Sequence, residues 1–167
     1  MSLVEKLSET GVLWISFVAT VAITFVFQLV AGSVGGTLLD SIADPDQTRD
    51  VLVGMSEAQR AMHAWLTGTL DVAYPAAYGA LFIGSAIKFY PSFGRYLAWT
   101  VFILVPVDLI EGIVQILALT DLADLLSTKA VLTSLKQILF IFALLFTVVG
   151  WVKWLISRVV GTKKKIG

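Results

Sequence analysis

Long apolar runs separated by short polar segments dominate the pattern of this chain. Four runs, at residues 11–31, 71–90, 96–120 and 130–153, contain few charged residues. As α-helices that rise ~1.5 Å per residue, runs of this length cross the ~30 Å hydrocarbon core of a bilayer. The pattern therefore predicts an all-α, polytopic membrane protein in which four transmembrane helices form a single domain over residues 1–167.

The composition of the chain favours the same class of protein. Hydrophobic residues make up 57% of the sequence and charged residues 14%, and the mean hydropathy is +0.88, unlike a soluble domain. The segment 31–33 resembles a signal-peptide cleavage site, but the apolar run before it is longer than a signal core, so we expect a retained first helix. The sequence contains no cysteine, which excludes disulfides, thiol catalysis and thiolate metal sites.

The polar segment between the first two runs carries two helix-start signals. Asp44 precedes a proline and Ser56 precedes a glutamate, and each is followed three residues later by a glutamine, as in a capping box. We predict a short helix over residues 45–53 and a second helix that begins near residue 57 and continues into the second span. Residues 44–69 are expected to form an extracytoplasmic helical lid over the mouth of the bundle.

Basic residues are distributed unevenly among the segments outside the spans. If the N-terminus is cytoplasmic, only Arg49, Arg60 and Lys129 lie outside the cell, and the remaining basic residues of these segments lie inside. Short cytoplasmic loops are enriched in Lys and Arg, so we predict a multi-pass protein of the cell inner (cytoplasmic) membrane with both termini cytoplasmic. The basic tail at residues 163–165 is expected to contact anionic membrane lipids.

Three ionisable side chains lie inside the apolar runs: Asp108 and Glu111 in the third, and Lys136 in the fourth. Asp71 lies at the outer end of the second run. A charge near the bilayer centre costs about 2.5–3.5 kcal/mol on insertion scales. Such side chains are usually paired, neutralised or directed into a wet cavity, so they are the main candidates for function.

Polar side chains recur with helical spacing on every span and reach the same, outer half of the membrane. We therefore predict one shared polar pocket that opens outward. Its candidate ligand-binding or proton-binding residues are Gln28, Arg60, Asp71, Tyr74, Tyr78, Asp108, Glu111, Gln115 and Lys136.

The charges of this pocket do not balance. Three carboxyls face Lys136, so a bound proton, a bound cation or Arg60 must compensate. On this basis Glu111→Gln should alter proton uptake or ligand binding more than folding, whereas Lys136→Met should destabilise the fold. The alternative is a structural ion pair of Lys136 with Asp108 or Glu111 that only locks the helices together.

Other kinds of chemistry find little support in the sequence. There is no phosphate loop, no Rossmann glycine pattern, no hydrolase motif and no triad-capable histidine within the predicted spans. His63 is expected to be solvated or interfacial, and one histidine with scattered carboxylates does not indicate a metal centre. We expect no metal, no cofactor and no nucleic-acid partner.

The middle third of the chain carries a set of spaced motifs: Arg60, Leu70-Asp71, Tyr74-Pro75, Tyr78-Gly79 and Asp108-x-x-Glu111. They resemble the LDxxxPxxYG and DxxE motifs of an uncharacterised family of small bacterial four-helix integral membrane proteins. The resemblance implies the four-helix architecture and marks Asp71, Asp108 and Glu111 as shared motif positions, whereas Gly112 departs from the asparagine of the family pattern. No known activity comes with it.

Three functions are compatible with these observations. The first is a module that binds or transports a small amphiphile or ion with proton or cation coupling, and four spans then imply a homo-oligomer. The second is an intramembrane enzyme that acts on a lipid or isoprenoid, with Asp108 or Glu111 as general base and a tyrosine or a protonated carboxyl as acid. The third is an accessory structural subunit whose polar positions assemble helices within a larger membrane complex.

Overall fold

The computed structural model describes residues 3–163 and contains no β-strand among them. The helical elements, in chain order, are α1 (Leu3–Leu7), α2 (Thr10–Val30), η1 (Ala31–Val34), η2 (Leu39–Ser41), α3 (Pro45–Gly54), α4 (Glu57–Phe89), α5 (Gly94–Leu119) and α6 (Leu126–Lys163). The predicted all-α class is confirmed. Lys164 and Lys165 of the predicted basic tail lie outside the described residues.

Four of these helices are long and apolar enough to cross a membrane. The qualifying segments are Thr10–Val34, Glu57–Phe89, Gly94–Leu119 and Leu126–Val160. They overlap the four apolar runs, and each begins earlier than its run, by one residue in the first and two in the third. The helix of the second run extends 14 residues towards the N-terminus, and that of the fourth extends four.

Both predicted helix starts in the segment after α2 are present. The side chain of Asp44 accepts a hydrogen bond from the Gln47 amide at the start of α3. Ser56 and Gln59 form a capping box in which each side chain bonds to the backbone of the other residue, at the start of α4. Each cap satisfies backbone amides of the first turn that have no partner within the helix. The caps therefore fix the starts of α3 at Pro45 and of α4 at Glu57.

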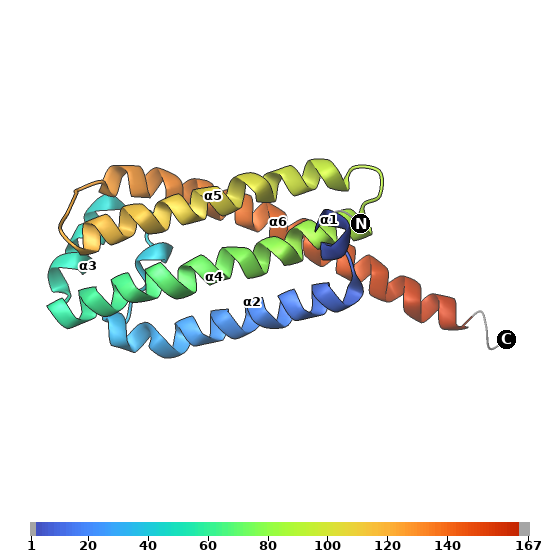
Figure 1. Ribbon diagram of the computed structural model, residues 1–167, viewed down its shortest axis with the longest axis horizontal. Coiled ribbons are helices and arrows are strands. Elements are labelled where there is room, and N and C mark those ends of the chain that lie inside the picture. The colour runs from blue at the N-terminus through green and yellow to red at the C-terminus, as the bar shows by residue number, and fades with distance from the viewer. Residues whose placement is uncertain (1–2, 164–167) are drawn as a thin grey trace.

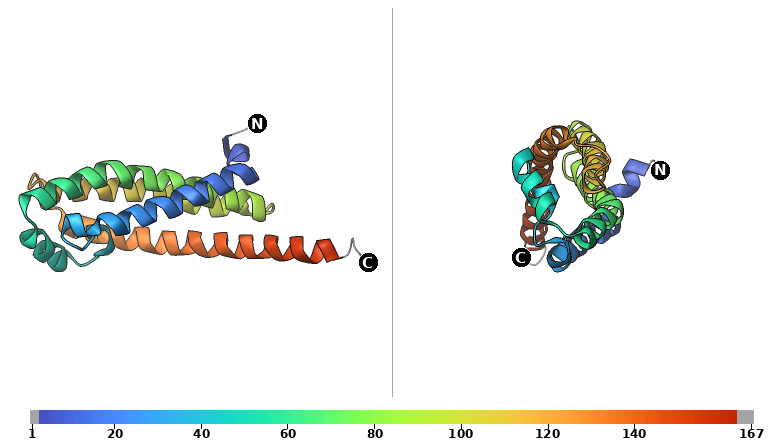
Figure 2. Two further views of the ribbon diagram at one scale, coloured as in Figure 1. Left: turned by 90° about the horizontal axis from the view of Figure 1, so that it is seen from below. Right: turned by 90° about the vertical axis from the view of Figure 1, so that its left-hand side faces the viewer.

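The long helices form an elongated bundle with α4 at its centre (Figure 1). α4 packs against α1, α2, α5 and α6, and α5 packs against α6. α2 packs mainly on α4, and it diverges from α6 towards the end of the bundle where α1 lies (Figure 2). A close approach of α1 to α4 is possible because Gly84 has no side chain, and a Cβ there would collide with the carbonyl oxygen of Leu7. The main apolar core lies between α4, α5 and α6 and includes Tyr78, Phe82 and Val101.

The segment between α2 and α4 closes the other end of the bundle, opposite α1 and the end of α6 (Figure 1). Leu39, Ile42, Leu52 and Met55 are buried there against the end of α5 and the start of α6. We call residues 31–56 the cap. The predicted lid therefore divides in two, because residues 57–69 lengthen α4 along the bundle, with Met62 and Trp65 exposed, while α3 belongs to the cap.

Candidate functional site

Lys136 on α6 is the centre of a cluster of charged side chains. Its Nζ lies 3.2 Å from Asp108 Oδ1 and 3.2 Å from Asp40 Oδ2, and it forms an ion pair with Glu111 Oε2. The Lys136 side chain is only 12% exposed. The structure thus brings together the ionisable residues of the third and fourth apolar runs. It adds Asp40 of η2, which sequence analysis does not include among the candidates.

A second lysine, Lys129, belongs to the same cluster. Sequence analysis placed it in a segment between the spans, whereas it lies within α6, which begins at Leu126, and its side chain is 1% exposed. Its Nζ donates hydrogen bonds to the carbonyl oxygens of Leu39 (2.8 Å) and Ile42 (2.9 Å). It also lies 3.6 Å from Glu111 Oε1. Lys129 therefore joins the cap to the charged cluster.

Glu111 is the most deeply buried member of the cluster, with no exposed side-chain surface. It lies between Lys129 and Lys136, and Thr133 donates a hydrogen bond to its Oε1. A buried carboxylate needs such partners because it has lost its hydration. The two lysines supply them, so Glu111 connects α5 to α6 at two points about two helical turns apart.

Asp108 has a different set of neighbours. Tyr78 on α4 donates a 2.7 Å hydrogen bond to Asp108 Oδ2, and Lys136 contacts the other oxygen. This arrangement lies beside a cavity of about 280 Å³, which we call the Asp108 cavity. It is lined by Asp40, Tyr74, Tyr78, Asp108, Lys136, Gln137, Phe140 and Ile141.

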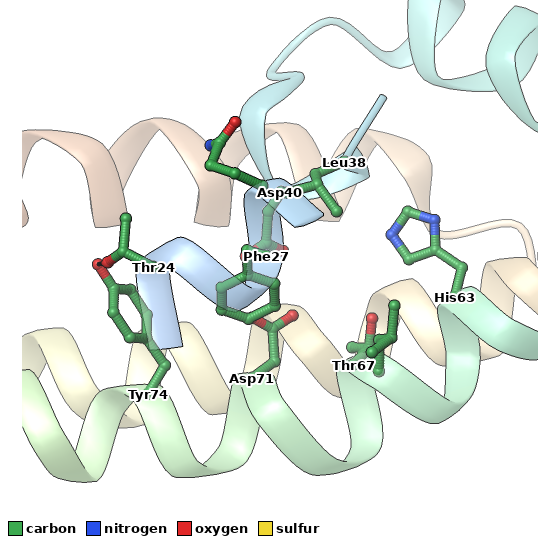
Figure 3. Close-up of a pocket in the computed structure, with 10 residues that line it drawn as sticks. Thr24, Phe27, Leu38, Asp40, His63, Thr67, Asp71 and Tyr74 are labelled. Carbon is green, nitrogen blue, oxygen red and sulfur yellow. Dashed lines mark hydrogen bonds between the residues drawn. The ribbon is translucent and has the colours of Figure 1, made fainter. Parts of the chain in front are cut away.

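Asp71 faces a second cavity, of about 170 Å³, between α2, α4 and the cap (Figure 3). We call it the Asp71 cavity. The side chains of Asp71 and Asp40 interact across it. Its lining residues are Thr24, Phe27, Gln28, Leu38, Asp40, His63, Leu66, Thr67, Asp71 and Tyr74. Because Asp40 and Tyr74 also line the Asp108 cavity, the two cavities are neighbours.

Tyr74 and Gln28 both line the Asp71 cavity. A 3.1 Å hydrogen bond joins Tyr74 Oη to Thr24 Oγ1 on α2. The ring of Tyr74 also meets the rings of Phe27 and Tyr78 edge to face. Gln28 lines the Asp71 cavity from α2. These contacts form an aromatic wall between the two cavities.

His63 is buried, at 2% exposure, so the expectation of a solvated or interfacial histidine is wrong. The early start of α4 places it on a helix that packs against α5 and beneath the cap. Gln115 Nε2 donates a 2.9 Å hydrogen bond to Thr67 Oγ1 and lies 3.5 Å from His63 Nε2. His63 Nδ1 and Gln115 Oε1 are buried without a hydrogen-bond partner. His63 lines the Asp71 cavity, and the ring projects from α4 towards the cap segment that carries Leu38 (Figure 3).

Arg60 is the one candidate that the structure does not bring to the site. Its guanidinium donates two hydrogen bonds to the carbonyl oxygen of Leu52, and a third, of 2.8 Å, to Asp121. It therefore joins α4 to the end of α3 and to the connection between α5 and α6. Compensation of the buried carboxyls by Arg60 is excluded in this arrangement.

A further ion pair joins the cap to the connection between α5 and α6, outside the apolar segments of the long helices. Arg49 Nη2 lies 2.9 Å from Asp124 Oδ2, between α3 and the connection from α5 to α6. The hydrogen bond from Arg49, with a smaller effect of the Leu126 amide, lowers the pKa of Asp124, and the same carboxylate raises the pKa of Arg49. Both side chains are solvated, so water and salt weaken the pair.

An apolar groove begins one helical turn beyond the Asp108 cavity. It has a volume of about 330 Å³ and runs between α2, α4 and α6. Its lining residues are Trp14, Phe17, Leu81, Phe82, Leu144, Thr147, Val148, Trp151, Val152 and Leu155. Apart from the Thr147 hydroxyl and the indole N–H groups of Trp14 and Trp151, the side chains of those ten residues are apolar, so this groove is suited to hydrocarbon.

Within residues 3–163, no group of three or more His, Asp or Glu side chains is arranged to hold a metal ion. The cluster is instead an interlocked set of ion pairs and hydrogen bonds next to two polar cavities. Comparison of the chain with models of protein families, with curated proteins and with solved structures gave no match. The functional argument therefore rests on the site itself.

Proposed function

We propose that the chain is an integral protein of the cytoplasmic membrane, with four spans, both termini in the cytoplasm and the cap outside. The support is the length and apolar character of α2, α4, α5 and α6. Large apolar side chains such as Val18, Leu29 and Ile138 are more than 60% exposed on the bundle surface. A soluble monomer rarely exposes a continuous apolar surface of this extent, and membrane lipids are its natural surroundings.

We further propose that the two cavities bind a small amphiphile or ion, and that binding is coupled to a proton or cation. The observation that carries this proposal is the charge balance around Lys136. Four carboxyls, of Asp40, Asp71, Asp108 and Glu111, interact with one another and with two lysines. In a medium of low dielectric constant such an excess of acid requires bound protons or a bound cation.

The layout of the cavities supports an amphiphile. The Asp71 and Asp108 cavities carry the polar groups, and the apolar groove lies beyond them along α4 and α6. A molecule with a polar head and an apolar chain matches this arrangement, with the head in the polar cavities and the chain in the apolar groove. If the protein transports its ligand, a homo-oligomer is part of the proposal, because four spans are few for a transporter that acts alone.

Photoreactive amphiphiles test this proposal in the full-length protein reconstituted in lipid nanodiscs. Alkyl diazirines with cationic, uncharged and anionic heads are cross-linked and their attachment sites are mapped by mass spectrometry. For at least one head group, we expect saturable labelling at Phe140 and Ile141 of the Asp108 cavity. Labelling that never saturates and follows only the outer apolar surface would show that the protein has no amphiphile site.

A second candidate function is supported by one contact. The Tyr78 hydroxyl and the Asp108 carboxyl form a hydrogen-bonded acid–base pair at a cavity whose far wall is Phe140 and Ile141. An intramembrane enzyme acting on a lipid or isoprenoid needs such a pair next to an apolar wall. Mass spectrometry of the bound amphiphile distinguishes the two functions, because a binding module returns it unchanged, whereas an enzyme returns a product that is lost in Tyr78→Phe.

A further inference from the structure

We propose that the ligand is an alkylammonium, a protonated primary amine whose head lies between Asp71 and Asp40 and whose chain lies towards the groove between α2 and α6. This inference rests on the function proposed above and gives it a ligand class. It is carried by three observations: a carboxyl without an ion-pair partner, a buried histidine nitrogen without a hydrogen-bond partner, and an apolar groove that follows the two polar cavities along α4.

Asp71 is the member of the cluster that lacks a contacting cation. Lys136 is already in contact with Asp40, Asp108 and Glu111, and Lys129 is held by the cap and by Glu111. Within residues 3–163 the ion pairs at 4.0 Å or less include none to Asp71. An added ammonium between Asp71 and Asp40 brings the number of cations closer to that of carboxyls and replaces lost hydration with charge-assisted hydrogen bonds.

His63 indicates that the cavity receives a polar group. Its side chain is 98% buried, it lines the Asp71 cavity, and its Nδ1 has no hydrogen-bond partner. A buried polar atom without a partner is costly. With the Gln115 amide turned so that Oε1 faces His63 and Thr67, Oε1 accepts a hydrogen bond from His63 Nε2–H. Nδ1 is then an acceptor, and an ammonium N–H in the cavity can supply its missing donor.

Aromatic rings add a second attraction for a cation. Phe27 and Tyr74 stand edge to face, with centroids 5.8 Å apart, in the wall of the Asp71 cavity. Ring faces attract ammonium groups within about 6 Å, more strongly where water is excluded. An anionic head gains neither from these rings nor from the carboxyls, which would repel it.

The chain of the ligand has an apolar path beside α4. Tyr74 and Tyr78 separate the Asp71 cavity from the groove, and Phe82 lies one turn after Tyr78. From Asp71 to Phe82 the helix rises ~16 Å, a distance that a dodecyl chain spans. The rings of Trp14 and Phe17 on α2 meet Trp151 on α6 across the groove. Exposed lining residues on α6, Leu144, Val148 and Val152, place the groove at the apolar surface of the bundle.

The test is an equilibrium binding measurement with the full-length protein in nanodiscs of zwitterionic lipid, with empty nanodiscs subtracted. Three probes share one chain: dodecylammonium, uncharged N-dodecylacetamide and anionic dodecanoate. We expect dodecylammonium to bind at least tenfold more tightly than the other two. Asp71→Asn should remove this preference and Asp71→Glu should keep it. Asp50→Asn, which removes the same charge from the exposed surface of α3, should leave it unchanged.

The chain is tested separately with methylammonium and with Leu144→Trp, which fills the apolar groove from a half-exposed position. We expect methylammonium to bind at least tenfold more weakly than dodecylammonium, and Leu144→Trp to weaken only dodecylammonium. If N-dodecylacetamide binds saturably and as tightly as dodecylammonium, the ammonium class is wrong while the amphiphile site stands. If none of the three long-chain probes binds above empty nanodiscs, and the diazirine labelling is not saturable, the amphiphile site is wrong as well.

Discussion

Lys129 Nζ donates a 2.8 Å hydrogen bond to the carbonyl oxygen of Leu39, ninety positions earlier in the chain. The same ammonium reaches Ile42 and Glu111, so one side chain fixes the cap to α6 and compensates a buried carboxyl. The cap also carries Asp40, which contacts Lys136. The position of the cap and the charge of the site are therefore coupled.

This coupling makes Lys129→Met a sensitive test. The change leaves Glu111 with one lysine and removes the donor of two cap carbonyls, and breaking a buried pair in this way costs about 3–5 kcal/mol. We expect reversible unfolding in mixed micelles to show a loss of this size. Hydrogen exchange should accelerate at the amides of residues 39–42 more than at those of α2. Lys153→Met on the exposed surface of α6 is the control, and an equal loss there would remove the special role of Lys129.

Much of the fold follows from local patterns in the sequence. Run length identifies the four long helices, and the side chains of Asp44 and Ser56 identify where α3 and α4 begin, because caps act within a few residues. The meeting of Asp108 and Glu111 with Lys136 follows from depth and from spacing on one helix face. These are properties of single helices, which the sequence specifies directly.

The residues that sequence analysis missed depend on contacts between distant segments. Asp40 lies in η2, a single 3-10 turn that no regular spacing in the sequence announces. It reaches Lys136 because Leu39 and Ile42 are buried against the end of α5 and the start of α6. Lys129 looked like a loop residue because a basic residue after a turn normally stays in water. The extra helical turn that buries it, and the carbonyls that bind it, become visible only when the cap is folded.

The Arg49–Asp124 pair gives the cap a dependence on acid pH. Because the pKa of Asp124 is lowered in the folded protein, the pair stabilises fully above the ordinary aspartate pKa, and the contribution is lost as pH falls through the lowered folded value. We expect the carboxyl carbon resonance of Asp124 to titrate below its usual range. Arg49→Gln should move the midpoint back up, and Lys153→Gln, on α6 away from the cap, should leave it in place. A midpoint that is the same in Arg49→Gln would contradict the pairing.

The orientation of the bundle can be tested with single cysteines, since the natural chain has none. Asp50→Cys in α3 should react with a membrane-impermeant maleimide added to cells whose outer membrane has been removed and whose cytoplasmic membrane is intact. Arg95→Cys, near the connection between α4 and α5, should react only after the membrane is opened. The distribution of Lys and Arg is the reason for this expectation. The reverse labelling pattern would place the cap in the cytoplasm.

The last prediction concerns Glu111 and Lys136 as a pair. The sequence alone predicts that Glu111→Gln affects binding more than folding, but the contacts with both Lys129 and Lys136 give this carboxylate a structural role too. We now expect Glu111→Gln and Lys136→Met each to lower the free energy of unfolding by about 3 kcal/mol or more, because each leaves buried charges without partners. The double variant should lose less than the sum of the two, with a coupling energy of about 1–3 kcal/mol. Unfolding of all four proteins in mixed micelles measures that coupling. Additive losses would mean that the two side chains act independently, and the charged cluster could then not be treated as one site.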